Sequence, residues 1–181
     1  GGGPWRRVAA ASPAGEDLAC TLAGGQVLVG GTAGIVLSST DGGGTWQATD
    51  PLPDGAAIRG IAIDGAGDIW VASGAGCFAW DQAAALWVPR QEGLVTADIR
   101  VLADVPGSRG ELYAGTAHDL YHSHDGGGSW ALVGRGLWPT ALKWLAVDPG
   151  DMDQLVACSQ SGSLYVSQDA GDTWIELLDR I

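Results

Sequence analysis

The sequence predicts an all-β protein built from repeated units of four short antiparallel strands. Short apolar runs alternate with turns rich in Gly, Asp and Ser, and the 181 residues include 30 glycines. Five of the nine tryptophans recur at intervals of 41, 41, 43 and 44 residues. These are Trp5, Trp46, Trp87, Trp130 and Trp174. Four-stranded units with a period of about 40–45 residues are typical of β-propeller blades.

The sequence pattern predicts the same order of four strands in each unit. The first is an apolar run such as IRGIAID (58–64) or LKWLAVD (142–148), and the second follows a polar turn, as in ELYAGT (111–116). The third strand, for example DLYHS (119–123), alternates apolar and polar residues as a half-buried strand does. The fourth strand opens at the recurring tryptophan. The predicted blades are 18–58, 59–99, 100–142 and 143–181.

An extra strand precedes the first blade. The segment WRRVAA (5–10) has the character of an outer strand, whereas the last blade already has its own outer strand, WIELLDRI (174–181). The sequence therefore favours a section of a larger propeller of about six to eight blades. Two alternatives remain: two chains that complete one ring, since an incomplete stack exposes blade faces, and a closed ring of four blades.

Three near-identical segments join the third strand of a blade to the fourth: STDGGGTW (39–46), SHDGGGSW (123–130) and SQDAGDTW (167–174). Their Asp is placed to accept backbone N–H bonds from the turn, the glycines permit positive φ, and the Trp covers the hairpin. We expect a structural role without catalysis. The residues are Ser39, Asp41, Gly43, Thr45 and Trp46; Ser123, Asp125, Gly127, Ser129 and Trp130; and Ser167, Asp169, Gly171, Thr173 and Trp174.

This pattern, S-x-D-x-G-x-T/S-W, resembles the Asp-box or BNR repeat of sialidase-like β-propellers. The wider pattern is similar to that of the photosystem II assembly factor family, sortilin-type receptors and xyloglucan-degrading glycoside hydrolases. Positions 80–87, WDQAAALW, keep only the Trp, and positions 1–5 keep only GGGPW. The resemblance implies that the boxes lie on the blade periphery, away from the site of action. It also implies an extracytoplasmic location.

Composition disfavours several classes of function. The net charge is −12, with one Lys and eight Arg, so no nucleic-acid partner is expected. The chain contains no run of 18 apolar residues, so no membrane insertion is predicted. His118, His122 and His124 lie close in sequence, but no carboxylate or Cys completes a zinc pattern, so no metal site is predicted. No cofactor motif is present either.

The best candidates for ligand binding are basic residues at one repeated position. Arg59, Arg100 and Lys143 each lie 13 residues after a recurring Trp, at the start of the strand that lines a propeller channel. Together they would hold a carboxylate or an acidic peptide. The alternative is that each pairs with a neighbouring carboxylate, such as Asp98 or Asp64. Trp138 and Trp144 are candidate platforms for sugar stacking, or else inter-blade packing residues.

No catalytic residue is predicted. The chain has three Tyr and four Glu, and it lacks the Arg-Ile-Pro segment of sialidases. The sequence therefore favours a non-enzymatic binding or assembly module that presents a propeller surface to a protein or an acidic ligand. The alternative is a fragment of a carbohydrate-active propeller of the glycoside hydrolase type, which would use two carboxylates across a cleft.

Overall fold

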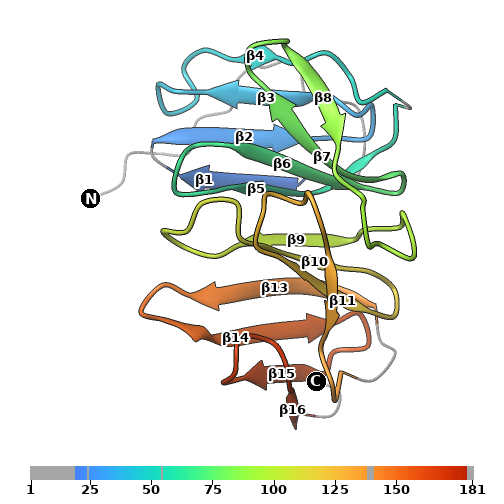
Figure 1. The fold of residues 1–181 in the computed structure, drawn as a ribbon. Coiled ribbons are helices and arrows are strands. Elements are labelled where there is room, and N and C mark those ends of the chain that lie inside the picture. The colour runs from blue at the N-terminus through green and yellow to red at the C-terminus, as the bar shows by residue number, and fades with distance from the viewer. Residues whose placement is uncertain (1–18, 24, 54, 138–140, 179–181) are drawn as a thin grey trace.

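The protein is all-β, with sixteen strands in four antiparallel sheets (Figure 1). The computed structural model describes residues 19–23, 25–53, 55–137 and 141–178. The extra strand predicted at 5–10 and the candidate Trp138 lie outside these residues. Within them the chain forms no helix, and therefore none that is long and apolar enough to cross a membrane.

The strands follow the chain in groups of four, and each group is one blade. Blade one contains β1 (Ala19–Ala23), β2 (Gln26–Gly30), β3 (Val36–Ser39) and β4 (Gln47–Ala48). Blade two contains β5 (Ile58–Ile63), β6 (Ile69–Ser73), β7 (Gly76–Asp81) and β8 (Leu86–Pro89). Blade three contains β9 (Val101–Asp104), β10 (Leu112–Gly115), β11 (Leu120–Ser123) and β12 (Ala131–Val133). Blade four contains β13 (Leu142–Asp148), β14 (Asp151–Ser159), β15 (Leu164–Ser167) and β16 (Ile175–Leu178).

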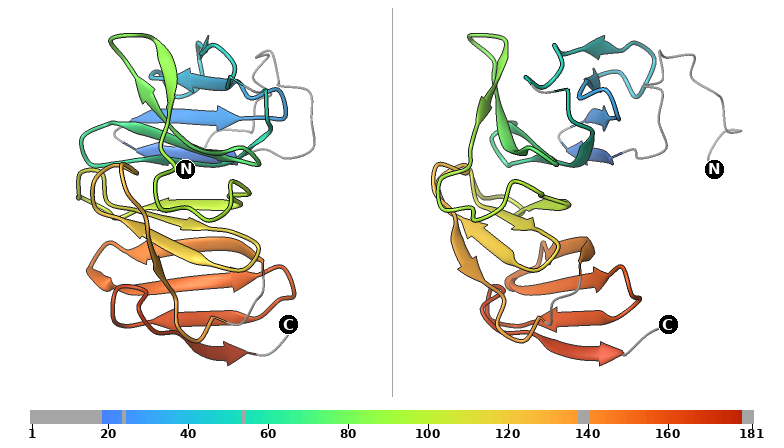
Figure 2. Two further views of the ribbon diagram at one scale, coloured as in Figure 1. Left: turned by 45° about the vertical axis from the view of Figure 1, so that its right-hand side comes forward. Right: turned by 90° about the vertical axis from the view of Figure 1, so that its right-hand side faces the viewer.

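The four blades are arranged as a β-propeller, which confirms the predicted fold class. Their first strands pack in succession, β1 on β5, β5 on β9 and β9 on β13. The blades follow one another along an arc (Figure 2). Among the described strands, β1 and β13 share no comparable contact, so they lie at the two ends of the arc. The exact limits of the blades and the size of the whole propeller stay predictions.

Apolar side chains fill the space between successive blades. One cluster joins blades one and two through Leu28, Ile58 and Trp87, and similar clusters join the later pairs. Full burial of such a side chain stabilises the fold by roughly 1.5–3 kcal/mol. At Gly60 the blades approach so closely that a Cβ would lie 2.9 Å from the backbone N of Leu102. Glycine at this position therefore permits the contact between blades two and three.

Candidate ligand-binding site

The predicted basic residues lie at the start of the first strands of blades two to four. Arg59 is the second residue of β5, Arg100 directly precedes β9, and Lys143 is the second residue of β13. The residue before each of them is buried, namely Ile58, Ile99 and Leu142. Because side chains alternate along a strand, the basic groups are directed away from the core, and the side chains of Arg59 and Arg100 are 39% and 30% exposed.

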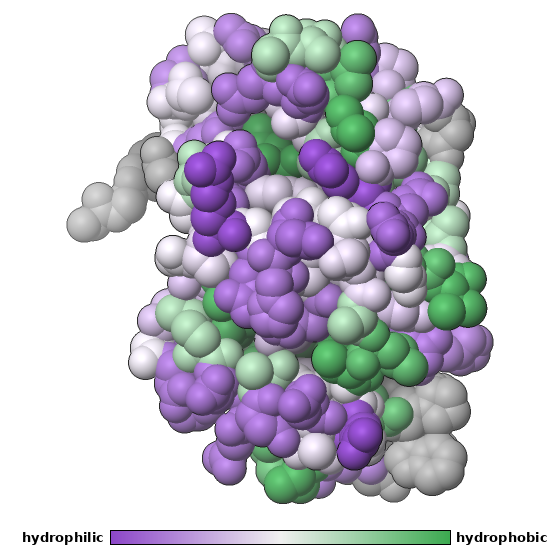
Figure 3. All heavy atoms as spheres, viewed as in Figure 1, coloured by the Kyte–Doolittle hydropathy of each residue, from purple (hydrophilic) through white to green (hydrophobic). Residues whose placement is uncertain are grey.

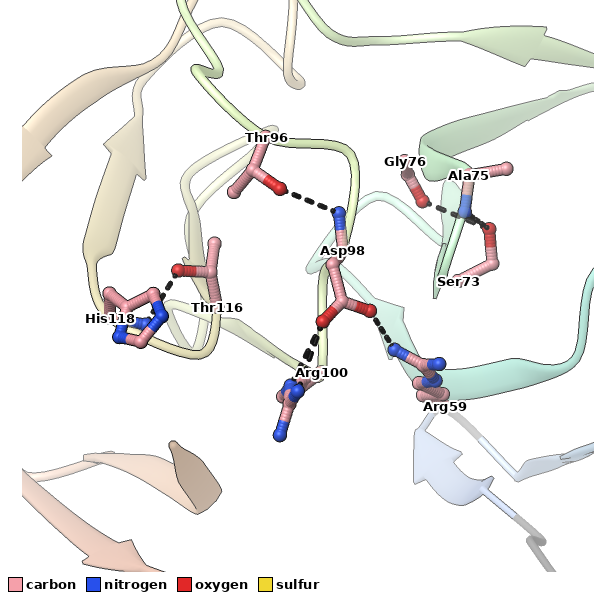
Figure 4. Close-up of polar contacts among 9 residues, drawn as sticks. All are labelled: Arg59, Ser73, Ala75, Gly76, Thr96, Asp98, Arg100, Thr116 and His118. Atoms are coloured by element: carbon pink, nitrogen blue, oxygen red, sulfur yellow. Dashed lines mark hydrogen bonds and ion pairs between the residues drawn. The ribbon is translucent and has the colours of Figure 1, made fainter. Parts of the chain in front are cut away.

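Arg59 and Arg100 converge on one carboxylate, that of Asp98 (Figure 4). Arg59 Nη1 contacts Asp98 Oδ1, while Arg100 donates from Nε and Nη2 to Asp98 Oδ2, both at 3.1 Å. Burial opposes ionisation of this carboxyl, but the hydrogen bonds and charges of the two guanidinium groups hold the pKa of Asp98 below its usual value. Two cations on one anion leave a net positive charge at this position.

The loops around the pair are held by hydroxyl-to-backbone hydrogen bonds (Figure 4). Thr96 Oγ1 accepts from the N–H of Asp98 at 3.2 Å, and Ser73 Oγ accepts from the N–H of Ala75 at 3.1 Å. In the next blade, Thr116 Oγ1 accepts from the N–H of His118 at 3.1 Å. These bonds keep the blade ends in a defined shape around Arg59 and Arg100. The two guanidinium groups stay charged, so they suit the recognition of a carboxylate better than the transfer of a proton.

The other predicted residues are less closely associated. No ion pair found within the described residues involves Lys143, whose side chain is exposed. Asp64, proposed as an alternative partner, lies elsewhere: its Oδ1 accepts from the N–H of Ala66 and its Oδ2 from that of Gly110, both at 2.8 Å. Of the two candidate carboxylates, only Asp98 therefore pairs with the basic residues.

Trp144 is 51% exposed and lies on a face of blade four that no other described blade covers. The same repeat position holds Gly60 in blade two and Val101 in blade three, and both are packed against the following blade. The neighbours of Trp144 on this face include Val156 and Ile175, which are also exposed. In blades two and three, the residue at the position of Trp144 therefore contacts the following blade.

The three boxed turns, residues 39–46, 123–130 and 167–174, lie at the opposite ends of the blades. In each turn the Asp accepts hydrogen bonds from the Ser two residues before it and from the Thr or Ser four residues after it. In the first, Thr45 N–H donates to Asp41 Oδ1 at 2.9 Å. This bond, followed by those from the hydroxyls of Thr45 and Ser39, lowers the pKa of Asp41 to about 2.

A cavity of about 700 Å³ between blades two and three was not predicted. Trp80, Arg90 and Asp125 contribute to its lining. Arg109 also lines it and pairs with Asp68 at 3.6 Å. The sequence gives no local signal for this cavity, because its walls come from two blades brought together by contacts such as the hydrogen bond from Gly65 N–H in blade two to Ser108 O in blade three, at 3.0 Å. On the outer face drawn in Figure 3, polar side chains surround scattered apolar patches.

Fold and geometry together define the class: the chain is a β-propeller of four blades. Its backbone is similar to that of an ancestral GH74 enzyme, with a TM-score of 0.72, 18% identity, and coverage of 96% of this chain and 25% of the enzyme. It is also similar to YCF48 bound to D1 peptide, with a TM-score of 0.63, 19% identity, and coverage of 86% and 50%.

A third similar structure is the extracellular domain of the BT4673 one-component system from B. thetaiotaomicron. Its TM-score is 0.70, with 18% identity and coverage of 90% of this chain and 22% of that one. This chain therefore spans half or less of the length of these three structures. No protein-family model matches the chain, and no curated protein matches it. At these identities the likeness concerns the fold.

Proposed function

We propose that this protein is a non-enzymatic binding or assembly module that holds an acidic segment of a partner protein at Arg59 and Arg100. The supporting observation is the convergence of two guanidinium groups on the single carboxylate of Asp98 in a chain of net charge −12. An incoming carboxylate finds the surplus positive charge there, and Arg offers it paired N–H donors. YCF48, a propeller of similar fold, has been solved with a bound peptide.

A fluorescent hexaglutamate peptide provides a direct test by fluorescence anisotropy. We expect the wild-type protein to bind it and the affinity to fall by about tenfold in Arg59→Ala and in Arg100→Ala, which corresponds to ~1.4 kcal/mol each. The matched control is Arg109→Ala, because this arginine is 79% exposed and lies at the opposite ends of the blades. Equal losses in all three variants, or no binding by the wild type, would rule out the proposed site.

The alternative is a fragment of a carbohydrate-active propeller. It is favoured by one observation, the cavity between blades two and three, whose lining includes Trp80 and the two acidic residues Asp81 and Asp125. Aromatic faces bind sugar rings, and an ancestral GH74 enzyme has a similar backbone. Titration with xyloglucan oligosaccharides under tryptophan fluorescence discriminates the two proposals. A saturable change that Trp80→Ala abolishes would support the alternative, whereas no change would support the peptide-binding module.

We further propose that the three boxed turns are Asp-box repeats, whose role is to hold the blades in shape.

The uncovered face of blade four, formed by Trp144, Val156 and Ile175, is proposed to be covered by a second copy of the chain. The equivalent positions in blades two and three pack on the next blade, so this face has the shape of a blade contact. By sedimentation equilibrium we expect the wild-type protein to have twice the monomer mass of 18.4 kDa. We expect Ile175→Asp to have the mass of the monomer. A monomeric wild type would contradict it.

A further inference from the structure

Three side chains that are common metal ligands meet at the boxed end of blade three. Glu111 directly precedes β10, His122 lies in β11, and His124 lies in the boxed turn that follows. Glu111 Oε1 is 3.1 Å from His122 Nε2 and 3.2 Å from His124 Nδ1. One ligand atom from each residue lies within 4.8 Å of the others. Ligand atoms bound to one Zn²⁺ at about 2.0–2.2 Å have comparable separations, so only a small movement is needed to enclose an ion.

The protein holds two of these groups in place before any ion arrives. The side chain of His122 is only 8% exposed, and its ring stacks on Tyr113 with a centroid distance of 4.0 Å and an interplanar angle of 11°. Tyr113 is itself fixed, since its hydroxyl donates to the backbone O of Ala170 at 2.8 Å. The backbone of His124 lies between Ser123 and Asp125, whose side chains share a hydrogen bond of 2.9 Å.

The charge around the cluster suits a cation. Glu111 supplies a carboxylate within the cluster, and Asp172 of blade four also acts electrostatically on His122. Asp172 and Asp153 of blade four act in the same way on Tyr113, which stacks on His122. Carboxylates from two blades therefore lie close enough to the cluster to favour a cation there.

The repeat itself does not require these residues. The positions equivalent to Glu111, His122 and His124 follow from the strand registers of the other boxed blades. They are Gln26, Ser38 and Thr40 in blade one, and Gln154, Val166 and Gln168 in blade four. The blades with the same turn fold without any imidazole or carboxylate at these places. The turn chemistry therefore does not explain why blade three has two His and one Glu.

We propose that Glu111, His122 and His124 bind one divalent transition-metal ion, with Zn²⁺ as the ion that the donor set fits. Two imidazole nitrogens and one carboxylate oxygen are ligands that zinc accepts, and three protein ligands leave one position for water or a further ligand. His124, with 74% of its side chain exposed, places that position next to solvent. The sequence pattern lacked a carboxylate, and the fold supplies it from the adjacent strand.

Titration of the whole protein with ZnCl₂ by isothermal calorimetry, in the presence of a phosphine reductant, tests the proposal. We expect one ion per chain, and a metal affinity lower by ~100-fold or more in His124→Ala and Glu111→Gln. Loss of only a hydrogen-bond partner of a metal-binding residue already lowers metal affinity by about 10–100-fold, so loss of the binding residue itself should cost at least as much. His124 is exposed and Glu111→Gln preserves shape, so both variants are expected to fold. His118→Ala is the matched control, because His118 is the remaining histidine and is exposed.

A second measurement reads the ligands directly. With three histidines in the chain, proton NMR should show the ring signals of two histidines shifting on addition of Zn²⁺ while that of His118 does not. Hydrogen bonds from the two imidazoles to Glu111, with no ion, are the competing explanation, and they predict no heat and no shift. Binding that survives His124→Ala but is lost in Cys20→Ser would assign the ion to the exposed thiol of Cys20 and would overturn the proposal.

Discussion

The indole Nε1 of Trp70 donates a hydrogen bond to the backbone O of Gly126, 2.9 Å away in the next blade. Tyr113 occupies the same position one blade later, and its hydroxyl donates to the backbone O of Ala170 at 2.8 Å. The second strand of one blade is thus tied to the boxed turn of the following blade. The boxed turns of blades three and four therefore contribute to the contacts between blades as well as to their own hairpins.

Tyr113→Phe tests this tie, because it removes the hydroxyl and keeps the ring. We expect the free energy of unfolding to fall by about 1–2 kcal/mol, since the substitution leaves the carbonyl of Ala170 without its donor. Urea denaturation followed by tryptophan fluorescence gives the value. Tyr121→Phe is the control: Tyr121 is equally buried, and in the part of the chain that the structure describes its hydroxyl makes no hydrogen bond. Equal effects of the two substitutions would contradict the assignment.

The boxed turn of blade four contains a residue in a strained conformation. Ala170 has a φ of 55°, while glycines occupy the same position in the other two turns, Gly42 with a φ of 69° and Gly126 with a φ of 70°. A left-handed conformation costs a residue with a Cβ roughly 1–2 kcal/mol. Part of this cost is offset by the greater freedom of glycine in the unfolded chain.

Ala170→Gly is therefore expected to stabilise the protein by up to about 1 kcal/mol. Gly42→Ala is the reverse test, and it should destabilise by a similar amount for conformational reasons alone, because a Cβ at Gly42 would meet no atom within 4 Å. Thermal unfolding of both variants measures the two effects. A lower melting temperature for Ala170→Gly would show that strain at this turn is negligible.

The sequence allowed the fold to be predicted because its signals are local. Alternation within β11 and the Ser, Asp and Gly of each boxed turn act within a few residues, and the spacing of the tryptophans repeats them. The site residues were only partly predictable. Arg59 and Arg100 share a repeat position, but their common contact with Asp98 depends on how the connection before β9 folds between two blades.

The cluster of Glu111 and the two histidines shows the limit more clearly. His122 and His124 are two residues apart, so the sequence indicates that they share a strand face. Glu111 lies 11 residues before His122 and reaches it only because β10 pairs with β11 in the register that sets Tyr113 opposite His122. A shift of that register by one residue would turn His122 to the other face of the sheet. The contact is therefore decided by strand pairing, which the local pattern does not specify.

Asp125→Ala is expected to lower stability without affecting hexaglutamate binding. Asp125 Oδ1 accepts from Ser129 N–H at 2.8 Å and Oδ2 from the hydroxyl of Ser129 at 2.7 Å, whereas the basic pair lies at the opposite ends of the blades. Loss of these bonds should cost about 1–2 kcal/mol, because water replaces part of them at this exposed turn. Urea midpoints and peptide anisotropy on the same sample give both values. Weakened peptide binding with unchanged stability would reverse the assigned role.

The boxed aspartates also predict loss of stability in acid. Bonds from the following Thr or Ser and from the preceding Ser lower the pKa of Asp41 to about 2, and they also lower those of Asp125 and Asp169. Because these values lie below the unfolded value near 4, the carboxylates stabilise the fold above pH ~4. This contribution is lost as the pH falls towards 2. Asp104 acts in the opposite direction, because burial raises its pKa.

Urea midpoints measured from pH 7 to pH 2 should therefore decline mainly below pH 4. Asp125→Asn removes one of the depressed carboxyl groups, so its curve should start lower at pH 7 and converge on the wild-type curve near pH 2. Asp148→Asn is a suitable control, because it removes an exposed carboxylate outside the boxed turns. Parallel curves for the wild type and Asp125→Asn across this range would show that the hydrogen bonds of the turn do not depend on the charge of Asp125.

The role of Asp98 gives a prediction opposite in sign to the arginine substitutions. In the free protein its carboxylate occupies donors of both Arg59 and Arg100. Asp98→Asn keeps the shape of the side chain but removes the negative charge that competes with an incoming carboxylate. Affinity for hexaglutamate should therefore rise on the order of tenfold, since one nearby like charge is worth a kcal/mol or more at a partly exposed site. Asp148→Asn makes the same change in net charge at the far ends of the blades, so it separates the local effect from a general one. An increase in both variants, or in neither, would mean that the basic pair serves only to hold the connection before β9.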